Sequence, residues 1–173
     1  MSVDDLDRAL LLELLERPRA GLREYARVLG VARGTVAARF LRLQETGVIS
    51  DLAPQVSTRA LGYPVAAFVQ LDLAQGHLDS VVEALTEIGE VIEAHTVTGD
   101  GDLLCQVVAR DTPELEHVVQ RIIAIPGVVR TRSQVALTQR IPRRVLPLVR
   151  QAAGKGAARG SVRARTAAPR APR

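Results

Sequence analysis

The sequence is poor in several residue types, and each scarcity excludes a class of protein. Only two Phe, two Tyr and no Trp occur in 173 residues, so any core must be aliphatic. Cys105 is the only cysteine, which excludes an intrachain disulfide. No apolar run approaches the roughly 18 residues of a membrane-spanning helix, and the acidic start of the chain lacks a signal-peptide pattern. We therefore expect a cytoplasmic protein that has no membrane partner.

Motifs for catalysis and for metal or cofactor binding are also missing. His77, His95 and His117 are scattered and do not have the spacing of a metal site. No phosphate-binding glycine loop and no nucleophile motif occurs. Cys105 alternates within an apolar strand, where a thiol is expected to be buried and unreactive. The sequence thus predicts no catalytic residue, no metal and no cofactor.

Charge is distributed unevenly along the chain, although the net charge is only +4. Residues 1–60 carry net +1, residues 61–140 net −6, and residues 141–173 net +9 with no acid at all. Such asymmetry predicts a chain of three parts. The last part has no periodicity and almost no large apolar residues towards its end, so we expect 141–173 to be a basic disordered tail.

Residues 1–60 contain amphipathic segments with helical spacing. We expect helices over residues 4–16, 22–28 and 32–46. Asp4 and Asp7 have the spacing of a capping box at the first helix. Gly30 supplies the sharp turn that a helix-turn-helix needs between its second and third helices. A short strand and a linker are expected over 48–62, which would make this a winged-type helix-turn-helix domain.

Residues 61–140 alternate between strand-like and helix-like periods in the order βαββαβ. We expect strands over 65–73, 91–98, 103–109 and 128–138, and helices over 77–88 and 112–125. This order predicts a ferredoxin-like domain, and hence an α+β protein. Four strands and two helices leave one sheet face open. Because an open apolar face must be covered, we expect a homodimer or a larger even-numbered oligomer.

The third helix has the composition of a DNA recognition helix. With its apolar side turned to the core, its outward face consists of Arg33, Gly34, Thr35, Ala37, Ala38, Arg39 and Arg42. Small side chains let the backbone approach a DNA groove, and Arg binds guanine edges or phosphates. Arg23 and Arg27 on the second helix are expected to hold the DNA backbone. Considered alone, the helix is equally compatible with a solvated amphipathic helix.

A glycine-rich loop is the second candidate site. It comprises Thr98, Gly99, Asp100, Gly101 and Asp102. The glycines permit positive φ and leave backbone amides open to a ligand carboxylate, while an Asp can pair with a ligand ammonium. Asp-Gly is also a strong turn signal, so the residues alone favour a plain hairpin loop.

Five stretches carry a resemblance to a known family. They read VDDLDRALL, LREYARVLGVARGTVAARFLRLQETGVIS, LGYPVAAFVQLDL, HTVTGDGDLLCQVVARD and IPGVVRTRSQVALT. Together they resemble the Lrp/AsnC regulators, also called feast/famine proteins, over residues 3 to about 140. The resemblance implies a sequence-specific transcription regulator that binds double-stranded DNA. It also implies dimers, often octamers, assembled through the domain at 61–140.

The same resemblance implies an effector, an amino acid or related small molecule, bound at an oligomer interface. It favours effector binding by the glycine-rich loop, with Thr131 and Ser133 on the last strand at pocket-facing positions. Two departures stand out. Ala32 replaces the Ser that usually caps the third helix, and Gly101 occupies a position that tends to be aromatic, so the identity of the effector does not carry over.

Other functions stay open at this stage. Some proteins that resemble this family are sirohaem decarboxylases that no longer bind DNA, and His95 would then serve the enzyme. The outward arginines of the third helix would have no role in such an enzyme. A pure amino-acid sensor without DNA binding is a further alternative. An RNA-binding βαββαβ domain is rejected, because residues 91–98 and 103–109, which we expect to be its central strands, lack aromatics for base stacking.

Overall fold

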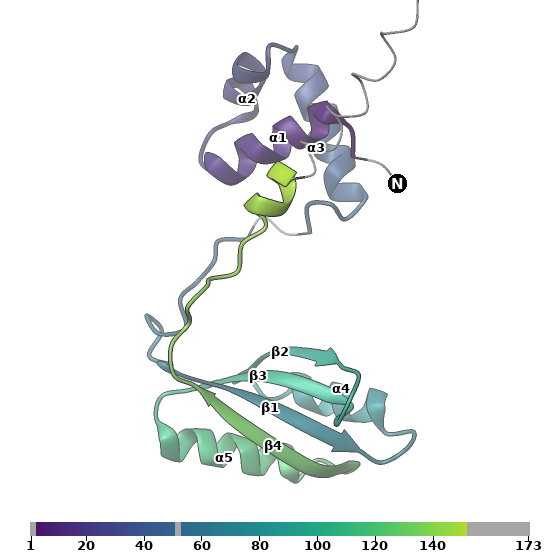
Figure 1. Ribbon diagram of the computed structural model, residues 1–173, viewed down its shortest axis with the longest axis vertical. Helices are drawn as coiled ribbons and strands as arrows, with labels where there is room; N and C mark the ends of the chain where they lie inside the picture. The colour runs from purple at the N-terminus through teal and green to yellow at the C-terminus, as the bar shows by residue number, and fades with distance from the viewer. Residues whose placement is uncertain (1–2, 51–52, 152–173) are drawn as a thin grey trace, which may run out of the picture. The chain divides into compact units, whose positions relative to one another are not determined.

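The computed structural model describes residues 3–50 and 53–151, which form two compact units (Figure 1). Of the described residues, unit 1 contains 3–50, Ala53 and 142–151. Unit 2 spans Pro54–Ile141. Most of the basic tail that we predicted lies outside the described residues.

Unit 1 has the three helices that the sequence predicts. They are α1 (Asp5–Glu16), α2 (Leu22–Leu29) and α3 (Arg33–Glu45). The Asp4 side chain accepts from the Asp7 amide and the Asp7 side chain accepts from the Asp4 amide, so the predicted capping box forms. Gly30 ends α2 with φ +65°, a left-handed conformation that suits glycine. The helices enclose an aliphatic core with one aromatic member, made by Leu10, Tyr25, Ala26, Val36 and Leu43.

Two expectations at the edges of unit 1 were wrong. Residues 48–50 and 53–62 contain no strand, so no wing forms in the described part of this segment. Residues 146–151, which we had placed in a disordered tail, are helical and cluster with unit 1. An ion pair of 2.7 Å joins Arg150 to Glu16 at the end of α1. The local reason is a short apolar run, Val145–Val149, that the charge argument overlooked.

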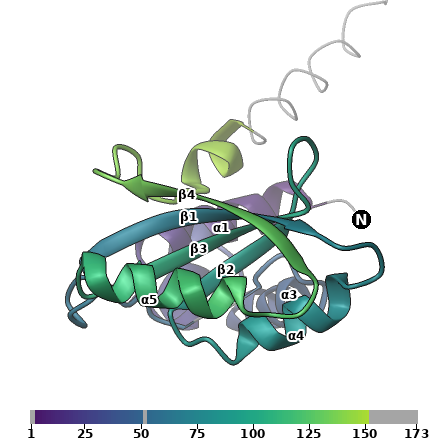
Figure 2. The same cartoon turned by 90° about the horizontal axis from the view of Figure 1, so that it is seen from below.

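Unit 2 confirms the βαββαβ order. Its elements are β1 (Val65–Leu73), α4 (Leu78–Thr86), β2 (Val91–Thr96), β3 (Leu103–Ala109), α5 (Thr112–Ile123) and β4 (Val128–Ala136). The strands form one antiparallel sheet in the order β2-β3-β1-β4, the ferredoxin-like arrangement. Figure 2 shows α4 and α5 on the same side of this sheet.

The two faces of the sheet differ in composition. Ala67, Val69 and Leu71 of β1 are fully buried and belong to the core beneath the helices. Directly paired residues share a face in an antiparallel sheet, so the register gives the open face. It carries Phe68, Gln70, Leu104, Gln106, Arg132 and Gln134. We expected an apolar open face, and the structure instead shows amide and charged side chains around Phe68, which is 40% exposed.

No described helix is long and apolar enough to cross a membrane. Among residues 3–50 and 53–151, no group of three or more His, Cys, Asp or Glu side chains is arranged to hold a metal ion.

Candidate DNA-binding surface and effector loop

The exposed residues of α3 include a run of small side chains near its N-terminal end. Arg33, Gly34, Thr35 and Ala38 are exposed, as the sequence predicts, while Val36 and Leu43 are buried on the opposite side. Leu41, one turn further on, is 55% exposed. A helix surface of this kind lets a backbone approach a groove without steric obstruction.

Arg39 and Arg42, which we predicted to contact DNA, form ion pairs with α1, and their contact with DNA stays a prediction. The Arg39 guanidinium donates to Asp4 and, at 2.9 Å, to Asp7, while Arg42 donates to Asp7. Their side chains are only 27% and 42% exposed. Both arginines therefore join α3 to the N-terminal end of α1. The periodicity of α3 could not reveal this, because it does not show which outward-facing positions α1 covers.

The carboxylate of Asp7 is fully buried, yet it stays charged. Burial alone would raise its pKa, but hydrogen bonds from Arg42, the Asp4 amide and Arg39 outweigh that cost and hold the pKa below its usual value. The hydrogen bond from Arg39 is also the main reason why the pKa of Asp4 falls to about 2. Unit 1 thus contains a charged cluster of two carboxylates and two guanidinium groups, which we call the Asp7 cluster.

The other arginines that we predicted to contact DNA differ in whether they have an ion-pair partner. Arg27 is exposed but forms an ion pair with Glu24 one turn earlier, and the resulting hydrogen bond lowers the pKa of Glu24. Arg23 and Arg33 are exposed and have no ion-pair partner among the described residues. Arg23 and Arg33 are therefore the most accessible cations that α2 and α3 offer to a phosphate or a base.

The glycine-rich loop joins β2 to β3 and is fastened to β1 and β4. The Asp102 carboxylate accepts from the Leu73 amide at 2.7 Å, and the Asp102 amide donates to the Leu71 carbonyl at 2.9 Å. Arg132 of β4 donates to the Asp100 carbonyl at 3.0 Å. Gly99 has φ +106°, a left-handed conformation. Asp102 thus has a structural role, whereas the Asp100 carboxylate has no partner among the described residues.

Two residues at this loop were missed by the sequence reasoning. A Cβ at Gly101 would lie 2.6 Å from the Gln70 side chain, so Gln70 closely approaches the loop. Arg132 pairs with Gln70 in the sheet register and also lies 3.5 Å from Asp72. Gln70 alternates with the core residues Val69 and Leu71 on β1, while Arg132 lies on the largely exposed strand β4. Only the register, which the sequence does not give, places them beside the loop.

Thr131 and Ser133 are not brought to this loop within one chain. They pair with Leu71 and Val69, whose side chains point to the helix side of the sheet. The loop contacts Gln70 on the open face instead. Because the effector is expected at an oligomer interface, the roles of Thr131 and Ser133 in binding it stay predictions.

The other singled-out residues have ordinary surroundings. Cys105 is fully buried, as predicted, and burial raises the pKa of its thiol to about 11. His77, His95 and His117 are exposed, and His95 lies 3.0 Å from Glu93.

Each of the two units matches a known domain family. Residues 3–44 match the AsnC-type helix-turn-helix domain, and residues 66–146 match the Lrp/AsnC ligand binding domain. An HTH-type transcriptional regulator of Pyrococcus abyssi is 31% identical over 137 residues, which cover 79% of this chain and 91% of that protein. The regulatory protein AsnC of Escherichia coli is 30% identical over 147 residues, covering 84% of this chain and 97% of that protein.

Solved structures agree with these matches. The structure of E. coli AsnC has a TM-score of 0.78 at 29% identity and covers 85% of this chain and 100% of that chain. A feast or famine regulatory protein from M. tuberculosis, complexed with L-methionine, has a TM-score of 0.75 at 30% identity. That match covers 83% of this chain and 97% of the mycobacterial one.

Proposed function

The chain belongs to the Lrp/AsnC family of transcriptional regulators, and from that premise we propose which of its surfaces bind DNA, effector and partner chain. It is a DNA-binding regulator with a ligand-binding domain, and not an enzyme. The sirohaem decarboxylase alternative is therefore dropped. Because its partner is DNA, we also propose that it acts in the cytoplasm.

The exposed stripe of α3 is the surface that we propose enters the major groove. The observation that carries this proposal is the run of small exposed side chains at Gly34, Thr35 and Ala38, with Arg33 free at its start. An Arg at the N-terminal part of a recognition helix reaches base edges, and small neighbours let the helix come close. Arg23 and Arg27 on α2 would hold phosphates, Arg27 less readily because Glu24 competes for it.

Arginine variants test this assignment on a selected specific duplex and a scrambled one. We expect Arg33→Ala to weaken specific binding about 10- to 100-fold and to spare most of the scrambled-duplex affinity. Arg23→Ala should weaken both complexes alike and lower the salt slope by about 1. Arg59→Ala, which removes the same charge from unit 2, is the matched control. Unchanged specific affinity for Arg33→Ala would remove Arg33 from the recognition surface.

The glycine-rich loop is the site that we propose for an amino-acid effector. A ligand ammonium would meet the free Asp100 carboxylate, and backbone amides near Gly99 and Gly101 suit a carboxylate. Gln70 and Arg132 extend the polar surroundings of the loop. The similarity to a mycobacterial regulator complexed with L-methionine supports this class of ligand.

Calorimetry with L-methionine and the other common amino acids tests the loop. We expect Asp100→Asn to weaken binding at least tenfold, because the ammonium loses a charged partner. Asp111→Asn, a helix cap outside the loop, serves as the control. If no amino acid binds the wild type, or if Asp100→Asn binds as well as the wild type, the loop is an ordinary hairpin.

We further propose a homodimer built on the open sheet face, with octamers as a larger assembly of such dimers. Phe68 supplies the exposed apolar centre, and the amides of Gln70, Gln106 and Gln134 can hydrogen-bond across the interface. Sedimentation of a Phe68→Arg variant should show a shift toward monomer, whereas Ile123→Arg on the helix side should not. A dimer of undiminished stability in Phe68→Arg would locate the interface elsewhere.

A further inference from the structure

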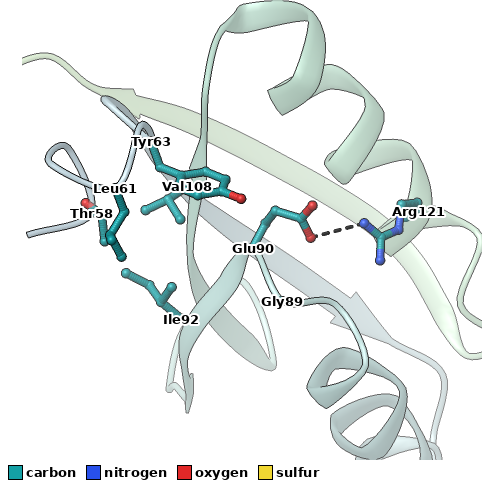
Figure 3. Close-up of a pocket in the computed structure, with 8 residues that line it drawn as sticks. All are labelled: Thr58, Leu61, Tyr63, Gly89, Glu90, Ile92, Val108 and Arg121. Carbon is teal, nitrogen blue, oxygen red and sulfur yellow. Dashed lines mark hydrogen bonds and ion pairs between the residues drawn. The ribbon is translucent and has the colours of Figure 1, made fainter. Parts of the chain in front are cut away.

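Unit 2 contains a pocket of about 440 Å³ that the proposed function does not use (Figure 3). It lies where β2 begins and β3 ends, since the Val108 amide donates to the Glu90 carbonyl at 2.9 Å. The glycine-rich loop joins the opposite ends of the same two strands. The pocket is therefore separate from the effector loop.

One wall of the pocket is a turn at the start of unit 2. The Tyr63 amide donates to the Thr58 carbonyl at 2.9 Å, and the Leu61 amide donates to the Ser57 carbonyl at 3.1 Å. The Arg110 guanidinium lies over the Tyr63 ring, 5.7 Å from its centroid. These contacts hold the turn in place without a ligand. The wall is thus largely pre-formed, as small-molecule sites usually are.

The pocket combines apolar and charged lining. Leu61 and Ile92 are large apolar residues with exposed fractions of 64% and 45%, and buried Val108 lies beside them. Figure 3 shows Glu90 and Arg121 facing each other across one side, joined by an ion pair of 3.1 Å. Surface apolar side chains beside a charge pair offer attachment points for both ends of an amphipathic molecule.

The ion pair leaves binding capacity unused. Only one guanidinium nitrogen of Arg121 and one carboxylate oxygen of Glu90 take part in it. A guanidinium has five N–H donors and a carboxylate about four acceptor positions. Among the described residues, no other partner satisfies the second Glu90 oxygen or the remaining Arg121 donors. A negative and a positive attachment point thus lie within a few ångströms of each other.

We propose that this pocket binds a small zwitterion with an apolar side chain, of the α-amino-acid class, at a second site distinct from the glycine-rich loop. The ligand ammonium donates to Glu90, the ligand carboxylate accepts from Arg121, and the side chain packs on Leu61 and Ile92. The volume is at the lower end of the range for small-molecule pockets, which suits an amino acid better than a nucleotide.

The test uses the full chain labelled with ¹³C-tyrosine, followed by NMR. The sequence holds only Tyr25 and Tyr63, so a Tyr63→Phe variant assigns both signals. The probes are L-leucine, 4-methylpentanoate, which lacks the ammonium, and 3-methylbutylamine, which lacks the carboxylate. We expect L-leucine to shift the Tyr63 signal saturably and to leave Tyr25 unchanged. Each single-charge probe should bind at least tenfold more weakly.

Variants separate this pocket from the loop. Glu90→Gln and Arg121→Gln should each weaken the L-leucine effect on Tyr63 at least tenfold, while Asp100→Asn should preserve it. Glu90 and Arg121 are partly exposed, so their loss should leave the fold of unit 2 intact; an unchanged circular dichroism spectrum checks this. The proposal is overturned if Tyr63 does not respond, if both pocket variants respond like the wild type, or if 4-methylpentanoate binds as well as L-leucine. Loss of the response in Asp100→Asn alone would assign the effect to the loop and also overturn the second site.

Discussion

Asp7 links α3, the helix that we propose enters the major groove, to α1 of unit 1. Its buried carboxylate accepts from both Arg39 and Arg42 of α3, and its other interactions cap α1. A buried carboxylate is costly unless it is paired and hydrogen-bonded, and here both conditions are met. Through these hydrogen bonds Arg39 and Arg42 hold α3 against α1, and their contact with DNA stays a prediction. The charge of these arginines could be read from the sequence, but their partners could not, because Asp7 is more than 30 residues away in the chain.

Replacing Asp7 with Asn should destabilise unit 1 by about 3 kcal/mol, because it removes the charge that two guanidinium groups are arranged around. Urea unfolding followed by Tyr25 fluorescence, in a Tyr63→Phe background, measures this for unit 1. Asp5→Asn is the control, since Asp5 forms an exposed surface pair with Arg8. We expect less than about 1 kcal/mol from that change. Equal losses in both variants would show that the Asp7 cluster contributes no more than a surface ion pair.

Unit 1 should also lose stability in acid. The pKa of Asp4 is lowered to about 2 and that of Asp7 is lowered from 3.8, so folding favours both charged forms. Stability from these groups is complete above the unfolded value near 3.8 and is lost as pH falls through the folded values. We expect the Tyr25 melting temperature to fall between about pH 4 and 2. An Asp4→Asn variant, which retains a capping side chain, should show a shallower fall, and an identical pH profile would contradict the assignment.

At the scale of elements, periodicity and capping predict where the helices and strands begin and end. They predict the contacts between those elements less well. Strands β1 and β3 begin and end as the alternation predicts, and the βαββαβ order is confirmed. The open sheet face was judged wrongly, because alternation shows which residues share a face but not that Gln70, Gln106 and Gln134 gather on one. Likewise, the sequence places Thr131 and Ser133 on a strand, but only the register shows that they pair with Leu71 and Val69.

The N-terminus of α3 is an element that a single substitution should improve. Ala32 is its N-cap residue and makes no side-chain cap hydrogen bond. Ala32→Ser supplies the missing acceptor and should stabilise unit 1 by about 1 kcal/mol. Urea unfolding measures the gain, with Ala124→Ser at the C-terminal end of α5 as the control. A gain of equal size in the control, or none at Ala32, would show that the first amides of α3 are already satisfied in another way.

At the scale of the whole molecule, the chain combines a DNA-binding unit, a ligand-binding unit and a basic extension. Residues 142–151 return to the DNA-binding unit, so the six positive charges of residues 152–173 follow directly from it in the chain. The division into a helix-turn-helix and a ferredoxin-like unit could be predicted from the change in period. The return of residues 142–151 could not, because it depends on a tertiary contact between Arg150 and Glu16.

Deleting residues 152–173 should weaken binding to specific and scrambled DNA alike. Each tail cation that neutralises a phosphate releases counterions and steepens the log–log salt slope by about 0.9, so deletion should flatten that slope. A variant with the six tail Lys and Arg residues changed to Gln keeps the length and should behave like the deletion. An unchanged slope in both variants would show that the tail does not contact DNA.

The most direct test of the whole account is a selection from random-sequence duplexes, followed by anisotropy titration of the enriched duplex and a scrambled one. The central claim is that α3 reads a DNA sequence while unit 2 senses an amino acid. We therefore expect an enriched duplex bound about 1,000-fold or more tightly than the scrambled one. At least one amino acid should change that affinity in the wild type. Equal affinity for both duplexes, with no amino acid altering it, would contradict the account.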